Sequence, residues 1–520
     1  MKDNQKTLNI LARGAIITFA GLFGSKALAY LYRVYIGRSL GPEAYGILSI
    51  GIAVTGIATS ISTLSQGSGL QRFLPKAESQ KKEEDFIKSS LSLTLPVSFV
   101  LTAGMFLLSP QIASIFGNQN AVSVIRVLAL VPIFDTLMDI SVNVAKAHKK
   151  QEYHIITSRI FQNVVQLTVT VLLIHLNYGV VGAAWGWVAG VVLSAFLGWY
   201  LLKTRIIENF SLSLSFESQR KKMLRYSLPL LMSGLVGSLL GWTDTLFIGY
   251  LLQESQVGIY NAALPTAAML GIPLSAVGSL MLPAMSEIIE DVEKARETIK
   301  TTSYWSLLLS TPIFTILFLF SSQVLRIMFS KEFLGGAMAL SILSIGYLFN
   351  AATGNITELV KASDKTDLIF KNTLGQVALN IPLNIVLIPR WGAGLGIAGA
   401  AVATASSMIL VNTLLVIESK YLLNISPFSK KMIKPFLASL IPAIGIYYLT
   451  NSIFKIVPLW ALILSTGIYG LLYLSSLILL KSFREEEIEI FIAVGRKIGK
   501  ENLTRKLLKL LRMDTQNQNQ

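Results

Sequence analysis

The chain has 520 residues, of which 52% are hydrophobic and only 14% are charged, and its mean hydropathy is +0.59. A soluble protein of this length needs a more polar surface, so this composition excludes the soluble globular class. The chain has no cysteine, which excludes disulfides and thiolate chemistry. The net charge of +16 could indicate nucleic acid as a partner, but basic loops also orient membrane proteins, and we expect no nucleic acid.

Apolar runs of about 20 residues recur along the whole chain, and each is long enough to cross a hydrocarbon core of about 30 Å. They predict an all-α polytopic membrane protein with about fourteen transmembrane helices. The expected spans lie near residues 11–36, 43–68, 88–108, 121–145, 155–175, 180–202, 226–251, 258–284, 302–322, 334–359, 368–389, 394–417, 432–450 and 457–480.

Lys and Arg residues alternate between the loops. Of the 45 in the chain, 37 lie near the N-terminus, in every second loop and in the C-terminal tail, and five lie in the opposite loops. Because basic loops stay on the cytoplasmic side, we expect a multi-pass protein of the cell membrane with both termini cytoplasmic. The opposite loops are short and nearly uncharged, so no outer domain is expected to hold an active site.

The chain contains an internal repeat. Gly37, Leu40 and Gly46 recur 212 residues later, Lys146 and Ala147 recur 215 residues later, and the segment around 179–184 recurs 217 residues later. Each copy has an even number of spans, so the copies have the same orientation and a pathway is expected between them. Linkers rich in Ser and Lys then divide the chain into an N-terminal six-helix lobe (1–205), a C-terminal six-helix lobe (222–417), two additional transmembrane helices (432–480) and a basic amphipathic tail (481–520).

Two cations fall inside the first expected span. Lys26 and Arg33 are seven residues apart and share one helix face, about 10 Å apart along the axis. Ionisable side chains in hydrocarbon are costly and usually face a cavity. Two stacked cations suit an anionic substrate that carries phosphate. The alternative is snorkelling toward the outer interface, which suits Arg33, near the end of its span, better than Lys26.

Acidic side chains also fall inside expected spans. Asp135 and Asp139 are four residues apart in the fourth span and are therefore neighbours on one helix face. Asp244, in the seventh span, lies within one residue of the repeat position equivalent to Arg33. One lobe thus carries a cation where the other carries an acid, as a cavity for a substrate and a coupling ion would require. A structural salt bridge between the lobes would give the same pattern.

The repeat adds two candidates in the second lobe. At the offset of 215, Asn350 corresponds to Asp135, and Glu358 corresponds to Asn143. We include both among the candidate ion-coupling or cavity residues. Hydrogen bonding between helices is the alternative role for Asn350 and for Asn380.

Several kinds of chemistry are not supported. The sequences GxxxxGK[ST], GxSxG and HExxH do not occur, so we expect neither nucleotide hydrolysis at a P-loop nor these hydrolase chemistries. The three histidines show no ligand spacing, so no metal site is expected. We therefore expect that the protein is not an enzyme and has no cofactor, although its transport could be coupled to Na⁺ or H⁺.

The sequence is similar to a known family. The early helix with Lys and Arg, followed by RSLGPEAYGILS (38–49) and the polar segment FLPKAESQKKEE (73–84), resembles the start of the polysaccharide (Wzx-type) flippases of the multidrug/oligosaccharidyl-lipid/polysaccharide exporter superfamily. TDTLFIGYLLQESQVGIYNAA (243–263) resembles that family's segment after the seventh helix. The resemblance covers nearly the whole chain, including twelve spans plus two.

The resemblance implies translocation of a polyprenyl- or dolichyl-linked oligosaccharide across the cytoplasmic membrane. Two lobes would form a V-shaped cavity with alternating access, and the two extra spans would hold the lipid tail. Lys26, Arg33 and Arg126 are the positions that could bind the (pyro)phosphate. The partners would be the lipid-linked oligosaccharide, membrane lipids and other proteins of polysaccharide assembly. The alternatives are an ion-coupled multidrug exporter and a membrane glycosyltransferase or polymerase that uses the same lipid carrier.

Overall fold

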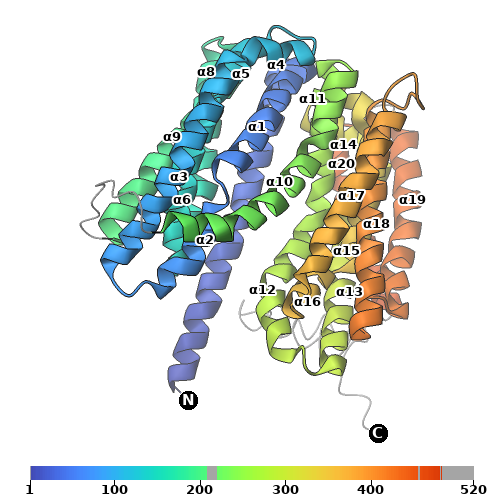
Figure 1. Cartoon of the computed structure of the whole chain (residues 1–520). Coiled ribbons are helices and arrows are strands. Elements are labelled where there is room, and N and C mark those ends of the chain that lie inside the picture. The colour runs from blue at the N-terminus through green and yellow to red at the C-terminus, as the bar shows by residue number, and fades with distance from the viewer. Residues whose placement is uncertain (1, 208–218, 455–456, 481, 483–520) are drawn as a thin grey trace. The chain divides into compact units, whose positions relative to one another are not determined.

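The computed structural model describes residues 2–207, 219–454, 457–480 and 482, and within them it consists of helices without strands (Figure 1). This confirms the predicted all-α fold class. The elements are α1 (Lys2–Ser62), α2 (Gln66–Phe73), η1 (Leu74–Lys76), α3 (Gln80–Leu107), α4 (Ser109–Ile115), α5 (Ala121–Leu128), α6 (Val131–Ala147), α7 (Gln151–His154), η2 (Ile155–Phe161), α8 (Gln162–His175), α9 (Gly179–Arg205), α10 (Arg220–Leu251), α11 (Glu254–Ala267), η3 (Ala268–Gly271), α12 (Ile272–Ile288), α13 (Val292–Leu319), α14 (Ser321–Met328), η4 (Lys331–Gly336), α15 (Ala337–Thr353), α16 (Ile356–Ala362), α17 (Thr366–Leu387), α18 (Ile397–Leu423), η5 (Lys430–Met432), α19 (Ile433–Ile453) and α20 (Leu459–Leu479).

In the described part of the chain, twelve helical segments are long and apolar enough to cross a membrane. Two features account for the difference from fourteen expected spans. Gly41 has φ 79° and ψ 178°, a conformation open only to glycine, so α1 is two helices that meet at this residue. The second feature is α17, which has 22 residues but is not among the twelve. Its buried residues Asn372, Asn380 and Asn384 make it less apolar.

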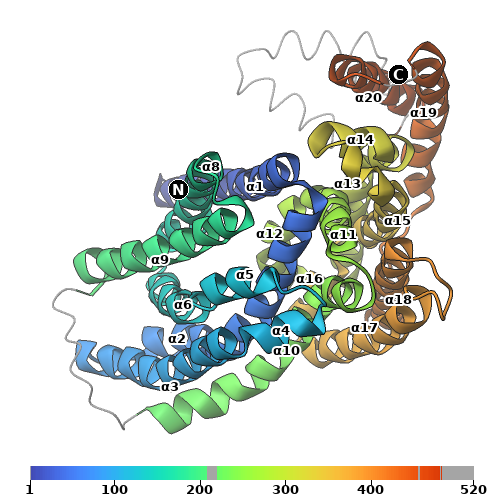
Figure 2. The same ribbon diagram turned by 90° about the horizontal axis from the view of Figure 1, so that it is seen from above.

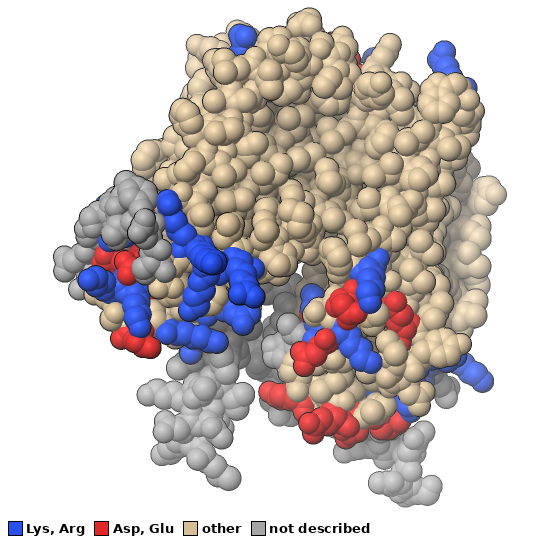
Figure 3. Space-filling model, viewed as in Figure 1, with Lys and Arg blue, Asp and Glu red and all other residues tan. Residues whose placement is uncertain are grey.

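The surface agrees with a multi-pass membrane protein. On the face drawn in Figure 3, charged side chains gather at helix ends, and the surface between those ends is uncharged. An apolar band between charged ends is what a bilayer requires of helices that cross it. The protein therefore spans a membrane several times.

The chain divides into two compact units. Unit 1 comprises Met1–Thr266, Met328–Ala339 and Phe370–Ser407, and unit 2 comprises Ala267–Ile327, Leu340–Ile369 and Met408–Gln520. These boundaries differ from those of the expected lobes, and the division into lobes and their V-shape stay predictions. The expected thirteenth and fourteenth helices correspond to α19 and α20 in unit 2. The predicted amphipathic tail lies, except for Ser482, outside the described residues.

Unit 1 has an apolar core where α2, α3, α6 and α9 meet the start of α10, and Figure 2 shows α10 running alongside α3. The core is close-packed because each helix contributes large aliphatic side chains to it. The residues buried there are Leu70, Leu74, Phe86, Ile87, Leu91, Ile140, Val144, Leu202, Ile207 and Met223.

Unit 2 has a core of the same kind, and part of it occupies equivalent repeat positions. Leu70 and Val144 of unit 1 correspond, at the offset of 215, to Met285 and Leu359 of unit 2. Equivalent core positions support the internal repeat. The residues buried in unit 2 are Met281, Met285, Ala295, Ile299, Ile356, Leu359, Val360, Leu415 and Ile425.

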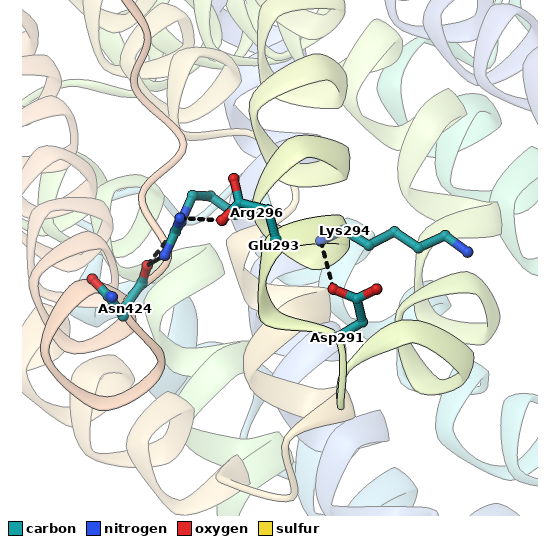
Figure 4. Close-up of polar contacts among 5 residues, drawn as sticks. All are labelled: Asp291, Glu293, Lys294, Arg296 and Asn424. Carbon is teal, nitrogen blue, oxygen red and sulfur yellow. Dashed lines mark hydrogen bonds and ion pairs between the residues drawn. The ribbon is translucent and has the colours of Figure 1, made fainter.

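Polar contacts hold the start of α13 beside the end of α18 in unit 2 (Figure 4). Asp291 caps α13 by accepting a hydrogen bond from the backbone N–H of Lys294 at 3.1 Å. Arg296 pairs with Glu293 and donates through Nε and Nη2 to the backbone oxygen of Asn424, at 3.2 and 3.1 Å. Arg296 therefore satisfies a carbonyl just beyond the end of α18.

A very close approach of two helices in unit 1 joins equivalent positions of the repeat. A Cβ atom on Gly46 in α1 would lie 1.8 Å from the backbone oxygen of Glu254, and one on Gly258 in α11 would lie 1.9 Å from that of Pro42. Pro42 and Gly46 correspond to Glu254 and Gly258 at the offset of 212, so the contact is reciprocal. A pseudo-two-fold axis therefore passes between the two glycines, and only glycine permits the backbones to come so close.

We expect Gly46→Ala to destabilise the protein by about 1–3 kcal/mol or more, because the added Cβ would meet backbone atoms that cannot move aside independently. Gly24→Ala, in the part of α1 before Gly41, is the matched control, because a Cβ at Gly24 has no atom within 4 Å. The control should be neutral or gain up to about 1 kcal/mol from helix propensity. Thermal unfolding of the detergent-purified variants measures both, and a Gly46→Ala variant as stable as the control would contradict the close crossing.

Candidate functional site

One candidate site lies beside the crossing of α1 and α11. Arg33 is half-buried, and its Nη1 donates a hydrogen bond to Tyr45 Oη at 3.3 Å. Tyr45 is buried and donates through Oη to the backbone oxygen of Asn261 at 3.0 Å. Its ring stacks on that of Phe329, with 6.3 Å between centroids. Within the described chain Arg33 makes this one hydrogen bond, so most of its five N–H donors are available to a ligand.

Lys26 lies two turns earlier in α1, on the side of Arg33 toward the N-terminus. Its side chain is exposed and makes no hydrogen bond or ion pair with the residues that the structure describes. Between the two cations, buried Tyr30 shares a hydrogen bond with Thr266, at 2.9 Å between Oη and Oγ1. The structure therefore keeps Lys26 and Arg33 on one continuous helix with a fixed tyrosine between them. Their role as substrate ligands stays a prediction.

Arg126 is placed differently. It is exposed on α5, where its Nε donates to Ser109 Oγ at 3.0 Å and its guanidinium lies 5.6 Å from the ring centroid of Phe106. These contacts join α5 to α4 and to the end of α3, rather than to Lys26 or Arg33. They give Arg126 a local structural role, and its predicted role in substrate binding remains untested.

A second candidate site surrounds Asp244 in α10, which is only 6% exposed. Tyr260 of α11 donates a hydrogen bond to Oδ2, and Thr404 of α18 donates to the same oxygen at 2.5 Å. Asn384 of α17 donates through Nδ2 to Oδ1 at 3.0 Å. Asn380, one turn earlier in α17, donates to Thr404 Oγ1 at 3.2 Å. Neutral donors from three further helices thus hold one buried carboxyl, and all of these residues belong to unit 1.

This site has the composition of an oxygen-lined cation site. Asp244 forms no ion pair with a Lys, Arg or His among the described residues. The Oδ1 atom of Asn384 is buried and has no hydrogen-bond partner there. A buried carboxylate without a cationic partner carries a high desolvation cost, which a proton or a bound cation removes. Carboxylate, amide and hydroxyl oxygens are the ligands that hard cations prefer.

The two sites are connected through neighbouring residues of α11. Asn261, which accepts from Tyr45 in the first site, also donates through Nδ2 to Thr245 Oγ1 at 3.1 Å. Thr245 is adjacent to Asp244, and Tyr260, the partner of Asp244, is adjacent to Asn261. Hydrogen bonds therefore run from Arg33 through Tyr45 to Asn261 and on to Thr245, the chain neighbour of Asp244.

The acids of α6 form a smaller polar cluster in unit 1. Asn143 donates to Asp139 Oδ1 at 2.7 Å and accepts from Gln71 Nε2 at 2.6 Å. A Cβ on Gly67 would lie 2.3 Å from Asn143 Nδ2, so α2 lies directly on this cluster. Asp135 is half-buried and forms no hydrogen bond or ion pair with the described residues. Asp135 and Asp139 lie on one face of α6, as their spacing predicted, and their functional role stays a prediction.

The remaining predicted residues have local partners in unit 2. Glu358 accepts a hydrogen bond from Lys361 Nζ at 2.8 Å within α16. Asn350 is half-buried in α15, and its backbone oxygen accepts from Thr353 Oγ1 at 2.8 Å. Neither is a partner of Asp244. The described residues contain no group of three His, Asp or Glu side chains that could hold a metal ion.

Sequence reasoning missed several of the residues that complete these sites. Tyr45, Tyr260 and Thr404 carry no signal in the sequence, because tyrosine and threonine are ordinary residues in membrane helices. Asn384 could have been found, since it lies four residues after Asn380 in an otherwise apolar helix and therefore on the same face.

The fold and these sites define a polytopic α-helical membrane protein with charged and polar groups held inside its spans. Among solved structures, the chain is similar to the lipid II flippase MurJ in an inward closed conformation, with a TM-score of 0.74 and 20% identity over 89% of this chain and 98% of that one. An inward-facing multidrug resistance transporter of the MATE family gives a TM-score of 0.64 at 15% identity, over 77% and 94% of the two chains. The fold is therefore that of this group of transporters.

The family follows from the sequence comparison. Residues 36–338, more than half of the chain, match the family described as polysaccharide biosynthesis protein, and the chain belongs to that family. A probable low-salt glycan biosynthesis flippase of Haloferax volcanii is 28% identical over 410 residues, which are 78% of this chain and 82% of that protein. Stage V sporulation protein B of Bacillus subtilis is 22% identical over 77% of this chain and 82% of its own length.

We expect Asn384→Ala to lower the free energy of unfolding by about 1–3 kcal/mol, because Asp244 Oδ1 would lose its donor in a buried site. Asn350→Ala is the control, since the Asn350 side chain makes no hydrogen bond with the described residues and its loss should cost no more than about 0.5 kcal/mol. Thermal unfolding in detergent compares the two variants. Equal destabilisation by the two variants would show that the hydrogen bond from Asn384 to Asp244 adds nothing to the stability of the protein.

Proposed function

We propose that this protein is a flippase that moves a lipid-linked oligosaccharide across the cell membrane for the assembly of a surface polysaccharide or glycan. The observation that carries the proposal is the pair Lys26 and Arg33 on one transmembrane helix of a chain that belongs to the polysaccharide biosynthesis family. A cation inside a span is costly unless it serves a ligand or an aqueous path. The fold shared with a lipid II flippase and the relative named a glycan biosynthesis flippase support this choice.

In this proposal the substrate's (pyro)phosphate binds between Lys26 and Arg33. Arg33 suits a phosphate because its planar guanidinium can donate two parallel hydrogen bonds, and Lys26 adds a compact charge. Tyr45 orients Arg33 by accepting one of its N–H groups, and the Asn261 carbonyl holds Tyr45. Tyr30, bonded to Thr266, fills the helix face between the cations. The proposal assigns no residues to the sugar chain, the lipid tail or a second phosphate, which would contact other parts of the pathway.

Asp244 is the proposed coupling residue. Exchange of H⁺ or Na⁺ at its carboxyl would change the charge at a site held by α10, α11, α17 and α18. Because Tyr260 and Asn261 are neighbours, a shift of α11 in response to that charge would also move the carbonyl that positions Tyr45. Asp135, Asp139, Asn350 and Glu358 remain secondary candidates for cavity polar groups.

The proposal extends to orientation and mechanism. The alternation of Lys- and Arg-rich loops supports a cytoplasmic location for both termini. The pathway opens alternately to the two sides as the lobes 1–205 and 222–417 rock about the crossing at Gly46 and Gly258. No covalent step on the substrate is involved, so the protein acts as a transporter rather than an enzyme. Other proteins of polysaccharide assembly supply the substrate and use the product.

We expect Lys26→Ala and Arg33→Gln each to lower the rate of flipping on the order of tenfold to a hundredfold, because each removes a charged hydrogen-bond partner of the phosphate. The measurement is outer-leaflet exposure of lipid-linked glycan in proteoliposomes. Lys331→Ala is the control, since Lys331 is an exposed cation at the start of η4 in the same unit.

Extracted yield and thermal stability separate transport from folding. Full flipping by Lys26→Ala at normal yield would remove Lys26 as a phosphate ligand. Transport of a soluble cationic drug, with no effect on lipid-linked glycan, would instead favour the multidrug exporter. Glycan transfer or polymerisation by the purified protein would favour the enzyme alternative.

Asp244→Asn tests the coupling proposal. The variant keeps the shape of the side chain but removes its charge, so flipping should no longer respond to an imposed Na⁺ or H⁺ gradient. The wild-type rate is expected to change with one of these two gradients. Asp139→Asn serves as the comparison, because Asp139 is also in a span but is bonded to Asn143. A gradient response that survives in Asp244→Asn would exclude Asp244 as the coupling residue.

A further inference from the structure

Unit 1 carries a basic surface with aromatic rings where α2 and η1 meet the start of α10. Arg72 lies over the ring of Tyr226, with 4.5 Å from Cζ to the ring centroid. Lys222 Nζ lies 4.8 Å from the ring centroid of Phe73 and 5.5 Å from that of Phe86. We call this surface the basic platform; its residues are Arg72, Phe73, Lys221, Lys222, Arg225 and Tyr226, with the buried Phe86 beneath them.

The aromatic rings fix the geometry of the basic platform. The rings of Phe73 and Phe86 are stacked, with centroids 5.5 Å apart and planes 7° apart. Tyr226 meets Phe73 edge to face at 5.4 Å. Cations placed over such rings are held near the surface rather than extended freely into water. The positive charges are therefore concentrated in one place before any ligand binds.

These cations are not neutralised by nearby acids. None of Arg72, Lys221, Lys222 and Arg225 forms an ion pair with a described residue. Two acids at the start of α3 have other partners: Glu83 pairs with His148 at 3.3 Å, and Glu84 pairs with Lys88 at 3.2 Å. Their neighbour Asp85 forms no ion pair with a described residue. The exposed Glu78 pairs with Lys82, whose hydrogen bond lowers the pKa of that carboxyl. The basic platform therefore keeps its positive charge for a ligand.

The shape of the surface suits an amphiphile with an anionic head. An open groove at the start of α10 is lined by Gln219, Lys221, Lys222, Arg225 and Tyr226. The cations line it at the positive end of the α10 dipole, which also attracts anions.

The helix continues from the groove with an exposed apolar face. Leu224, Leu228 and Met232 are 37%, 48% and 49% exposed and lie four residues apart, so they form one stripe along α10. Lys221 and Arg225 precede Leu228 by seven and three residues, which places these cations and the stripe on neighbouring parts of the same face. Charge at the helix end and apolar surface beyond it match a phosphate headgroup and its acyl chain.

We propose that the basic platform binds the phosphate headgroup of an anionic phospholipid, with an acyl chain of that lipid along Leu224, Leu228 and Met232. Under the orientation proposed above, the lipid belongs to the inner leaflet. The leaflet depends on that orientation, but lipid binding itself does not depend on flippase activity. The bound lipid would hold the first turns of α10 against α2 and α3, where Met223 is buried.

The test compares two triple variants of the full chain in nanodiscs of phosphatidylcholine with increasing phosphatidylglycerol. Arg72→Gln, Lys222→Gln and Arg225→Gln together remove three charges of the basic platform. Lys420→Gln, Lys430→Gln and Lys431→Gln together remove three exposed charges from unit 2 and form the matched control. Native mass spectrometry counts retained phosphatidylglycerol, and thermal unfolding reports its effect on stability.

We expect the wild type and the control to retain phosphatidylglycerol in preference to phosphatidylcholine. The basic-platform variant should lose at least about tenfold in apparent affinity for phosphatidylglycerol, since each basic residue near a headgroup contributes to binding. The charge-conserving pair Lys222→Arg and Arg225→Lys should keep most of the affinity. If the triple variant does not fold, Lys222→Gln and Arg225→Gln, each against Lys430→Gln, carry the same comparison.

Two results would overturn the proposal. An equal loss of phosphatidylglycerol in the basic-platform variant and the control would show that diffuse surface charge attracts the lipid. A polyprenyl diphosphate that displaces phosphatidylglycerol from the wild type, and whose own retention depends on the same three residues, would assign the basic platform to the transported lipid. Loss of flipping in any variant at unchanged lipid retention would concern the proposed function and leave this proposal standing.

Discussion

The sites of unit 1 depend on one close crossing of backbones, at Gly46 in α1 and Gly258 in α11. No side chain fits between the two helices there, because a Cβ on either glycine would overlap a carbonyl group of the other helix. The crossing fixes the neighbours of each glycine as well. Tyr45 precedes Gly46 and reaches the Asn261 carbonyl, three residues beyond Gly258. The position of Arg33, and through α11 that of the Asp244 site, therefore follows from a contact that contains no functional side chain.

The crossing also shows how a duplicated scaffold acquires two different sites. Pro42 and Gly46 of the first copy meet Glu254 and Gly258 of the second, so backbone contacts obey the repeat. The side chains do not: Arg33 occupies one copy, and the acid Asp244 lies within one residue of the equivalent position in the other. Backbone packing constrains both copies alike, whereas a side chain that faces a polar site is free to diverge. Opposite charges at equivalent positions support the proposed anion site and the proposed cation site on one framework.

Much of the fold could be predicted from the sequence because the bilayer imposes a simple requirement. Each span needs about 20 apolar residues, and the predicted fourteen correspond to helices once the break at Gly41 and the polar helix α17 are recognised. The break differs from the expected loop because glycine in this conformation turns the chain within one residue. The boundaries of the two units could not be predicted from the apolar runs, because they depend on contacts between helices far apart in sequence.

The candidate site could be predicted only in part. Lys26, Arg33 and Asp244 were identifiable because a charge in an apolar run is exceptional. Tyr260 and Thr404 were not identifiable, because they come from two other helices and become neighbours of Asp244 only through folding. Asn384 could have been found from its spacing to Asn380. Arg126 illustrates the opposite case: it is a cation within an expected span, but its side chain contacts Ser109 and Phe106 nearby in the chain. A charged residue in an apolar run is a candidate for a functional site. The contacts in the folded structure then show which of these residues already have a protein partner.

The physical difference between the two sites suggests how they would act together. Arg33 makes one hydrogen bond with the described residues, so an anion can bind to it without displacing another partner. Asp244 is buried among neutral donors and has no cationic partner among the described residues, so a proton or a cation bound there would remove a desolvation cost. The occupancy of the acid site therefore changes the local free energy far more than that of an exposed carboxyl would. Asn261, which accepts from Tyr45, is the chain neighbour of Tyr260, which donates to Asp244, so such a site is suited to make the position of α11 depend on a bound ion.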